Sequence, residues 1–249
     1  MTPSGPYPLL SVVHLIRPIG VRATTLQELR AAVSEADARA LFYHTRHGRL
    51  RHPVGDEAAP DDFSAWVNGV LQDREAAERV SFVVQSTNTA EELRTALLGV
   101  LAEIPEARGS KPAHEGGELV FLTLESVTIP TDFRPSTGRE LVHALMAADD
   151  SVWFYHLIEQ PWFSDGRPTL FEWSESIGEP RLAQWLVEDA SSGLPLGTLR
   201  RQLLKRWRQS RISRRVSEAA HASEDERREA GHDAVARFVR RITRTRRNA

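Results

Sequence analysis

The chain of 249 residues contains no cysteine, and it has only two methionines and three tyrosines. The lack of cysteine excludes disulfide scaffolds, thiolate zinc sites and cysteine nucleophiles. No apolar run approaches the roughly 20 residues that a membrane-spanning helix needs. The first eight residues lack the basic and apolar regions of a signal peptide. We therefore expect a cytoplasmic protein with no membrane partner, long enough to bury a substantial core.

Motifs of the common enzyme classes are also missing. The sequence has no Gly-x-Ser-x-Gly nucleophile motif, no phosphate-binding glycine loop ending in Lys-Ser/Thr, and no dinucleotide fingerprint after a strand. We accordingly expect no cofactor, and we favour a non-catalytic role over an enzymatic one.

The formal net charge of −2 conceals an uneven distribution of charge. After Leu199 there are 16 of the 32 basic residues and only six acidic ones, which makes the tail strongly basic and the body acidic. From Ser223 onward a helix is expected, with a narrow apolar stripe. Such a tail can mediate self-association or dock on a protein partner, bind nucleic acid, or remain solvated. The expected contact residues of the tail are Arg237, Arg240, Arg241 and Arg244.

An internal repeat is visible at an offset of 112 residues. The stretch Leu41-Phe42-Tyr43-His44 resembles Trp153-Phe154-Tyr155-His156, and the same offset carries Glu28-Leu29 onto Glu140-Leu141. Residues 105–117, between the two copies, are rich in proline and glycine, as linkers are. We predict an internal duplication, with a first repeat at 1–104, a linker at 105–117, a second, diverged repeat at 118–209 and an Arg-rich helical tail at 210–249.

Each copy opens with an apolar run that is rich in β-branched residues, as strands are (9–16 and 119–129). Capping-box patterns, Thr25 with Glu28 and Thr137 with Glu140, then predict the starts of helices. A second strand is expected at Val80–Val84, with 182–187 as its weaker counterpart, and a helix closes each copy. The sequence therefore predicts an α+β fold of two degenerate β-α-α-α-β-α repeats, packed pseudo-symmetrically, plus a C-terminal basic helical extension.

Four motifs of the first copy carry a family resemblance: Gly20-Val21-Arg22-Ala23, Tyr43-His44-Thr45, His52, and Asp62-Phe63-Ser64-Ala65-Trp66-Val67. Through them, residues 12–103 resemble a prokaryotic domain-of-unknown-function family with a Tyr-His-Thr-His … Asp-Phe-x-x-Trp-Val signature. Arg46 stands where that family commonly has its second histidine. The resemblance implies no established activity. It places relatives near sugar-transfer enzymes, so a sugar or other small-molecule ligand stays open.

The densest group of chemically useful side chains lies in the same segment. Imidazoles and a carboxylate suit a divalent metal ion, whereas the neighbouring arginines would repel one. The alternative to a binding module is thus a metal-dependent or hydrolytic enzyme. Its candidate ligands are His44, His47, His52 and Asp62.

Other candidates are aromatic. The pairs Tyr43-His44 and Tyr155-His156 occur in both copies, which suits either packing or contact with a ligand. Trp162 has no counterpart and lies near prolines, so we expect an exposed aromatic that binds ligand. Adjacent Asp61 and Asp62 are expected to cap a helix. We predict a non-catalytic binding or protein-interaction module, and the alternatives are the enzyme above and a nucleic-acid binder acting through the tail.

Overall fold

The computed structural model describes residues 5–52, 61–164 and 166–221, with side chains as far as residue 210. The chain forms two compact units, Met1–Leu203 and Leu204–Ala249. The fold described below is that of the first unit. The predicted helix from Ser223 and the four tail arginines lie outside the described residues.

A long two-stranded antiparallel ribbon runs through the first unit. Strand β1 (Leu10–Ala23) pairs with β2 (Leu119–Pro130), which confirms the two predicted strands. The register places His14 opposite Ser126, two residues that are themselves 112 positions apart. The pairing shifts between Pro18 and Arg22, where Gly20 takes a φ of +78° that favours glycine.

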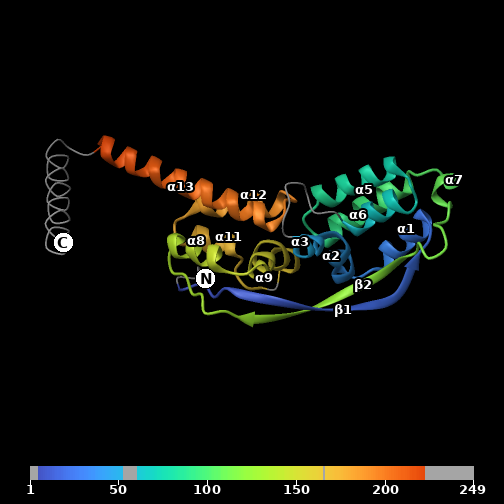
Figure 1. Ribbon diagram of the computed structural model, residues 1–249, viewed down its shortest axis with the longest axis horizontal. Helices are drawn as coiled ribbons and strands as arrows, with labels where there is room; N and C mark the ends of the chain where they lie inside the picture. The colour runs from blue at the N-terminus through green and yellow to red at the C-terminus, as the bar shows by residue number, and fades with distance from the viewer. Residues whose placement is uncertain (1–4, 53–60, 165, 222–249) are drawn as a thin grey trace, which may run out of the picture. The chain divides into compact units, whose positions relative to one another are not determined.

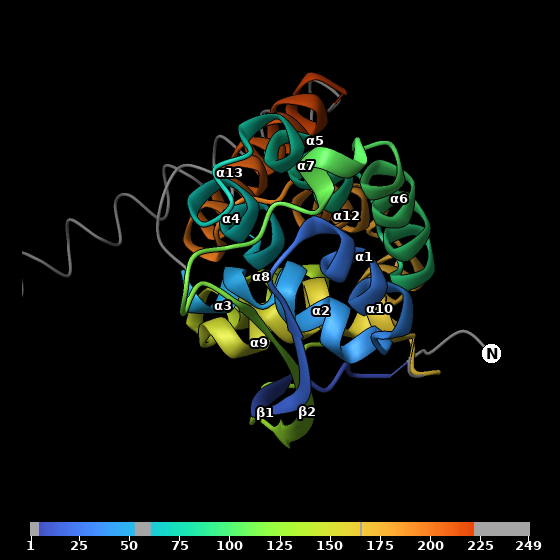
Figure 2. The ribbon, with the colours of Figure 1, turned by 90° about the vertical axis from the view of Figure 1, so that its right-hand side faces the viewer.

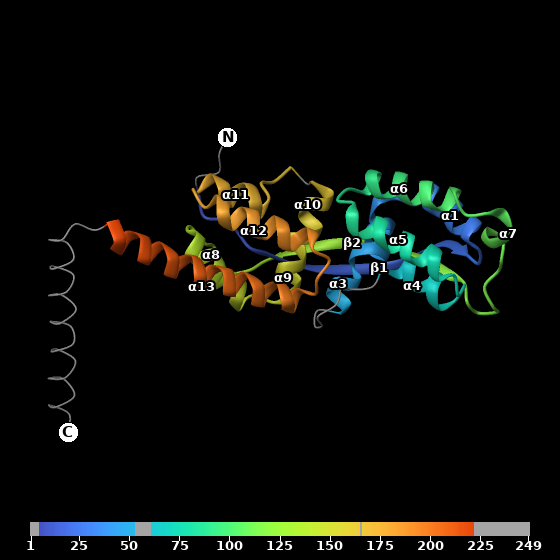
Figure 3. The same cartoon turned by 90° about the horizontal axis from the view of Figure 1, so that it is seen from above.

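Helices cover one side of the ribbon, as an end-on view shows (Figure 2). Helices α1 to α7 lie over one end of the ribbon and α8 to α12 over the other (Figures 1 and 3). The fold is therefore of the α+β class, as predicted. The first group comprises α1 (Leu26–Glu35), α2 (Ala38–Arg46), α3 (Gly48–Arg51), α4 (Asp62–Gly69), α5 (Arg74–Ser86), α6 (Ala90–Ala102) and α7 (Glu106–Gly109). The remaining elements are α8 (Gly138–Ala147), α9 (Asp150–Phe154), the π-helical turn η1 (Tyr155–Glu159), α10 (Gln160–Phe163), α11 (Leu170–Ser176), α12 (Pro180–Ser191) and α13 (Leu196–His221).

The order of elements predicted for each copy is wrong at one place. Val80–Val84 lies inside α5, and the segment 182–187 lies inside α12. In α5, Asp73 caps the start of the helix, and Ala76, Val80 and Val83 share one buried face at helical spacing. The β-branched residues therefore pack as a helix face, and among the described residues each predicted copy contributes one strand.

Large aromatic side chains form the core between the ribbon and the helices. The largest fully buried ones include Trp153, Trp173, Phe42 and Phe121. Within the described residues, no helix combines the length and the apolar character needed to cross a membrane.

The predicted helix starts are confirmed at both ends of the ribbon. Thr25 Oγ1 accepts a hydrogen bond from the Glu28 backbone N–H at 3.1 Å, and Thr137 Oγ1 accepts one from Glu140 at 3.2 Å. Each bond satisfies a donor of the first turn that would otherwise lack a partner.

The caps of α2 and α9 offer a matched comparison, because Asp37 and Asp149 are 112 residues apart. Asp37 accepts a bond from the Ala40 N–H at 2.7 Å, whereas Asp149 makes no side-chain cap bond. We expect Asp37→Ala to lower the free energy of unfolding by about 1 kcal/mol and Asp149→Ala by less than about 0.5 kcal/mol. Urea unfolding of both variants measures the difference. Equal losses would show that the Asp37 cap bond contributes nothing to stability.

Candidate functional site

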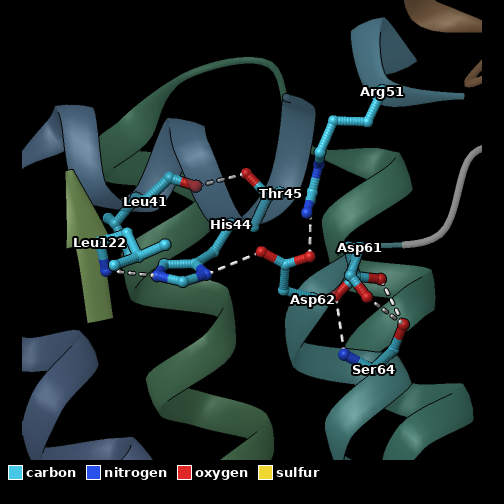
Figure 4. Close-up of polar contacts among 8 residues, drawn as sticks. All are labelled: Leu41, His44, Thr45, Arg51, Asp61, Asp62, Ser64 and Leu122. Carbon is cyan, nitrogen blue, oxygen red and sulfur yellow. Dashed lines mark hydrogen bonds and ion pairs between the residues drawn. The ribbon is translucent and has the colours of Figure 1, made fainter. Parts of the chain in front are cut away.

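His44 is buried and uses both nitrogens of its ring (Figure 4). Nε2 accepts a hydrogen bond from the backbone N–H of Leu122 in β2 at 2.9 Å. Nδ1 must then carry the proton and donate to Asp62 Oδ2, also at 2.9 Å. Arg51 donates to the other oxygen of the same carboxylate at 2.6 Å. This set of bonds, the His44 clasp, ties α2, α3 and α4 to strand β2.

His156 makes the corresponding contact with the other strand. Its Nε2 accepts from the backbone N–H of Leu10 in β1 at 2.8 Å, and its Nδ1 lies 3.0 Å from Gln160 Oε1 and 3.3 Å from the Tyr7 hydroxyl. Leu10 and Leu122 are 112 residues apart, as are His44 and His156. Each histidine thus binds the strand at the start of the opposite predicted copy.

Two tryptophans repeat this crossed arrangement. Trp66 Nε1 donates to the carbonyl of Gly117 at 2.7 Å, and Trp173 Nε1 donates to the carbonyl of Gly5 at 3.0 Å. Gly5 and Gly117 again differ by 112 positions, and they precede β1 and β2. The helices of each half therefore hold the chain that leads into the other half's strand.

Asp61 and Asp62 have separate roles. Asp61 caps α4 by accepting from the Ser64 N–H at 2.7 Å, as predicted, and burial raises the pKa of its carboxyl. Burial also acts to raise the pKa of Asp62, but the hydrogen bonds from His44 and Arg51 outweigh it and bring that pKa below its ordinary value. Asp62 is therefore ionised within the clasp.

The four candidate metal ligands are only partly brought together. His44 and Asp62 meet in the clasp, whereas the His47 ring stacks on Tyr43 with centroids 5.1 Å apart. His52 is exposed at the C-terminal cap of α3. In the described part of the chain, no three His, Asp or Glu side chains are grouped so that they could hold a metal ion. His44 also has no ring nitrogen left for one.

His47 is a buried base beside another imidazole. Burial is the main cause that lowers the pKa of His47 from the ordinary 6.5 to about 4, and the charge of His14 is the second. The folded protein therefore takes up this proton at a much lower pH than the unfolded chain does. The contribution of neutral His47 to the free energy of unfolding is therefore complete above pH 6.5, and it is lost as the pH falls toward 4.

We expect this titration to be measurable. Between pH 7 and pH 4 the wild type should lose about 2 kcal/mol of unfolding free energy more than His47→Leu, which cannot titrate there. Chemical unfolding of both proteins across this range gives the difference directly, since all other titratable groups are the same in both. Parallel curves for the two proteins would contradict the assignment.

The remaining aromatic candidates are buried. Tyr43 and Tyr155 are 6% and 3% exposed, with Arg51 and Arg167 lying over their rings at 5.5 Å and 5.9 Å. The expectation of an exposed Trp162 is wrong, because this side chain is only 9% exposed. Its ring packs against that of Phe42, with centroids 5.7 Å apart, since α10 follows directly on the π-helical turn.

A second site lies beside Trp162, and we call it the arginine pocket. It is a cavity of about 290 Å³, walled by charged groups on one side and by apolar groups on the other. The charged side comes from the end of α2 and from α3, and the apolar side from η1, α10, α11 and α12. Its lining residues are Arg46, Arg49, Asn88, Thr89, Leu157, Ile158, Pro161, Trp162, Phe171, Val187, Ala190 and Ser191.

Arg46, the last residue of α2, and Arg49, in α3, both line this pocket. Arg49 is 4% exposed and donates from Nη1 to the Ala190 carbonyl at 2.8 Å, but its Nε and Nη2 find no hydrogen-bond partner among the described residues. Arg46 donates from Nη2 to the Thr87 carbonyl and lies 5.1 Å over the Trp162 ring, and its Nε is likewise without a partner there.

The charges of Arg49, which is buried, and Arg46, which is partly buried, are poorly compensated. Burial lowers the pKa of Arg46 to about 10, and burial together with the charge of Arg46 does the same to Arg49, so both are still cationic at pH 7. Within the described residues neither has a carboxylate at ion-pair distance. The carboxylate of Asp61, whose field reaches Arg46, is hydrogen-bonded to Ser64. An uncompensated buried charge is costly, so this geometry suits a bound anion.

This pocket is not among the sites predicted from the sequence, where the arginines beside His44 and His47 count only as charges that would repel a metal ion. The available signal was the spacing of three residues between Arg46 and Arg49, directly after the apolar and aromatic run Leu41-Phe42-Tyr43, which places two cations near one helical face beside the core.

Comparisons with known proteins agree with the fold. A solved structure, that of OrfY from Thermoproteus tenax, matches with a TM-score of 0.67 at 22% sequence identity, covering 83% of this chain and 97% of that chain. At that identity the likeness concerns the fold alone. A comparison with curated proteins finds no significant match. A family model matches residues 4–208 and so covers both halves of the ribbon and its helices. The chain belongs to DUF5752, a family of unknown function.

Proposed function

We propose that the protein is a non-catalytic binding module that holds a small anionic ligand in the arginine pocket. One observation carries this proposal: the guanidinium group of Arg49 is buried in the wall of a cavity with two of its nitrogens unpartnered among the described residues. Proteins rarely bury a charge without a partner. An anion in the cavity supplies both the missing charge and the missing acceptors.

The contacts of His44 in the clasp support a binding role over a catalytic one. A general base needs a nitrogen that can reach a substrate, but both nitrogens of His44 are engaged in bonds that position a strand. His44 therefore belongs to the scaffold of the proposed module. Because His44 is occupied in this way, the arginine pocket is the better candidate for a ligand-binding site.

We further propose that the scaffold is an internal duplication whose halves exchange strands. In support, the antiparallel register pairs His14 with Ser126, so a twofold axis through that pair relates residues at the repeat offset of 112. The crossed bonds of His44 and His156 follow the same symmetry, as do the acceptors of the two tryptophans, Gly117 and Gly5. Arg46 and Arg49 correspond at this offset to Ile158 and Pro161, which line the same pocket. The pocket thus lies at the seam, cationic on one side and apolar on the other.

Thermal unfolding with added anions tests the binding proposal. At constant ionic strength, replacing chloride by sodium phosphate or sodium sulfate should raise the melting temperature of the wild type in a saturable way. Arg49→Gln should abolish that rise. Arg74→Gln is the matched control, because the Arg74 side chain is 85% exposed. A rise that is equal in all three proteins would reflect general salt effects and would overturn the proposal.

A further inference from the structure

Resting on the proposed function, we infer that the ligand is a phosphate monoester whose phosphate group lies between Arg46 and Arg49 and whose organic body lies against the apolar wall. Charge is the first argument. The buried guanidinium group of Arg49 and the partly buried one of Arg46 carry a formal charge of +2, and burial weakens the solvation of both. A phosphate monoester carries about −1.5 to −2 at pH 7, whereas a carboxylate or a sulfate ester carries a single negative charge.

Hydrogen-bond capacity is the second argument. The unpartnered nitrogens are Arg46 Nε, Arg49 Nε and Arg49 Nη2. These N–H donors belong to two separate planar guanidinium groups, whereas a carboxylate offers only two oxygens, both in one plane. The three terminal oxygens of a phosphate monoester point in three directions and can meet both planes. The Asn88 and Thr89 side chains line the same cavity and add polar groups at its rim.

The shape of the pocket indicates what the phosphate is attached to. The wall opposite the arginines is formed by apolar side chains, among them Leu157, Pro161 and Phe171. Trp162 adds a buried indole N–H that has no hydrogen-bond partner among the described residues. A cavity of about 290 Å³ is at the lower end of the range for small-molecule sites, so it has room for a phosphate group and a compact organic body. The indole favours an oxygen acceptor on that body.

Four small probes test this inference by isothermal titration calorimetry on the full chain: phenyl phosphate, inorganic phosphate, phenyl sulfate and benzoate. We expect phenyl phosphate to bind at least tenfold more tightly than each of the others. Because the second pKa of a phosphate monoester is near 6, binding of phenyl phosphate should weaken several-fold from pH 7.5 to pH 5.5. Binding of phenyl sulfate should change much less over the same range.

A variant separates the phosphate group from the body. Val187 lines the apolar wall and is 45% exposed, so Val187→Phe should fold and partly fill that side of the pocket. It should weaken the binding of phenyl phosphate about tenfold and leave the affinity for inorganic phosphate within twofold.

If phenyl sulfate binds as tightly as phenyl phosphate, the inference of a dianionic ligand is overturned while anion binding stands. Equal affinity for inorganic and phenyl phosphate would overturn the organic body. If no probe binds, the proposed function fails as well.

Discussion

Replacing His44 by alanine is expected to lower the free energy of unfolding by about 2–4 kcal/mol, the largest loss we expect from one substitution outside the aromatic core. The change removes the acceptor of the Leu122 N–H and the donor to Asp62, and it leaves a cavity where the ring lies against Phe63 and Phe121. Urea unfolding followed by circular dichroism measures the loss.

Matched variants separate the clasp bond from simple loss of volume. In His44→Gln the side-chain oxygen can take the place of Nε2 and accept from Leu122, so this variant should recover part of the loss. His156→Ala, at the corresponding position of the other half, should lose a similar amount because its Nε2 accepts from Leu10 at 2.8 Å. His143→Ala, on an exposed side chain, should change little. If His44→Ala behaved like His143→Ala, the clasp would not hold the strand.

The parts of the fold that the sequence predicted correctly are those governed by neighbouring residues. A threonine three residues before a glutamate determines a helix start whatever the helix packs against. The run Leu119–Pro130 is long and β-branched enough that only a strand accommodates it. Val80–Val84 is short, and a short apolar run fits a strand or a buried helix equally well. Its outcome depended on Asp73 and on packing partners distant in the sequence.

The candidate site depended on contacts between distant parts of the chain. Arg49 reaches the carbonyl of Ala190, 141 residues away, and Arg46 lies over Trp162. Arginine is usually exposed, so a pair of arginines in a sequence predicts a solvated surface. Only contacts with α10 and α12, which are distant in the sequence, remove them from the surface. Trp162 is buried among the same helices, which the sequence did not predict.

Replacing Arg49 by methionine is expected to have opposite effects on the empty protein and on the ligand-bound one. Methionine has a similar length and no charge, so it removes a buried cation that lacks an ion-pair partner among the described residues. Loss of the bond to Ala190 opposes this gain. In chloride, without a phosphate ligand, we expect the variant to be more stable than the wild type by about 1 kcal/mol. With saturating phenyl phosphate the order should reverse, because only the wild type is stabilised by binding.

This reversal distinguishes a binding residue from a structural one. A structural arginine stabilises the protein whether or not ligand is present, so its removal would lower stability under both conditions. A binding arginine holds a charge that the fold alone does not need, and its removal is harmful only when the ligand is there. Unfolding curves in chloride and in phenyl phosphate, with Arg74→Met as the exposed control, separate the two roles. A less stable Arg49→Met in chloride would assign Arg49 to the fold and leave the pocket without its main cation.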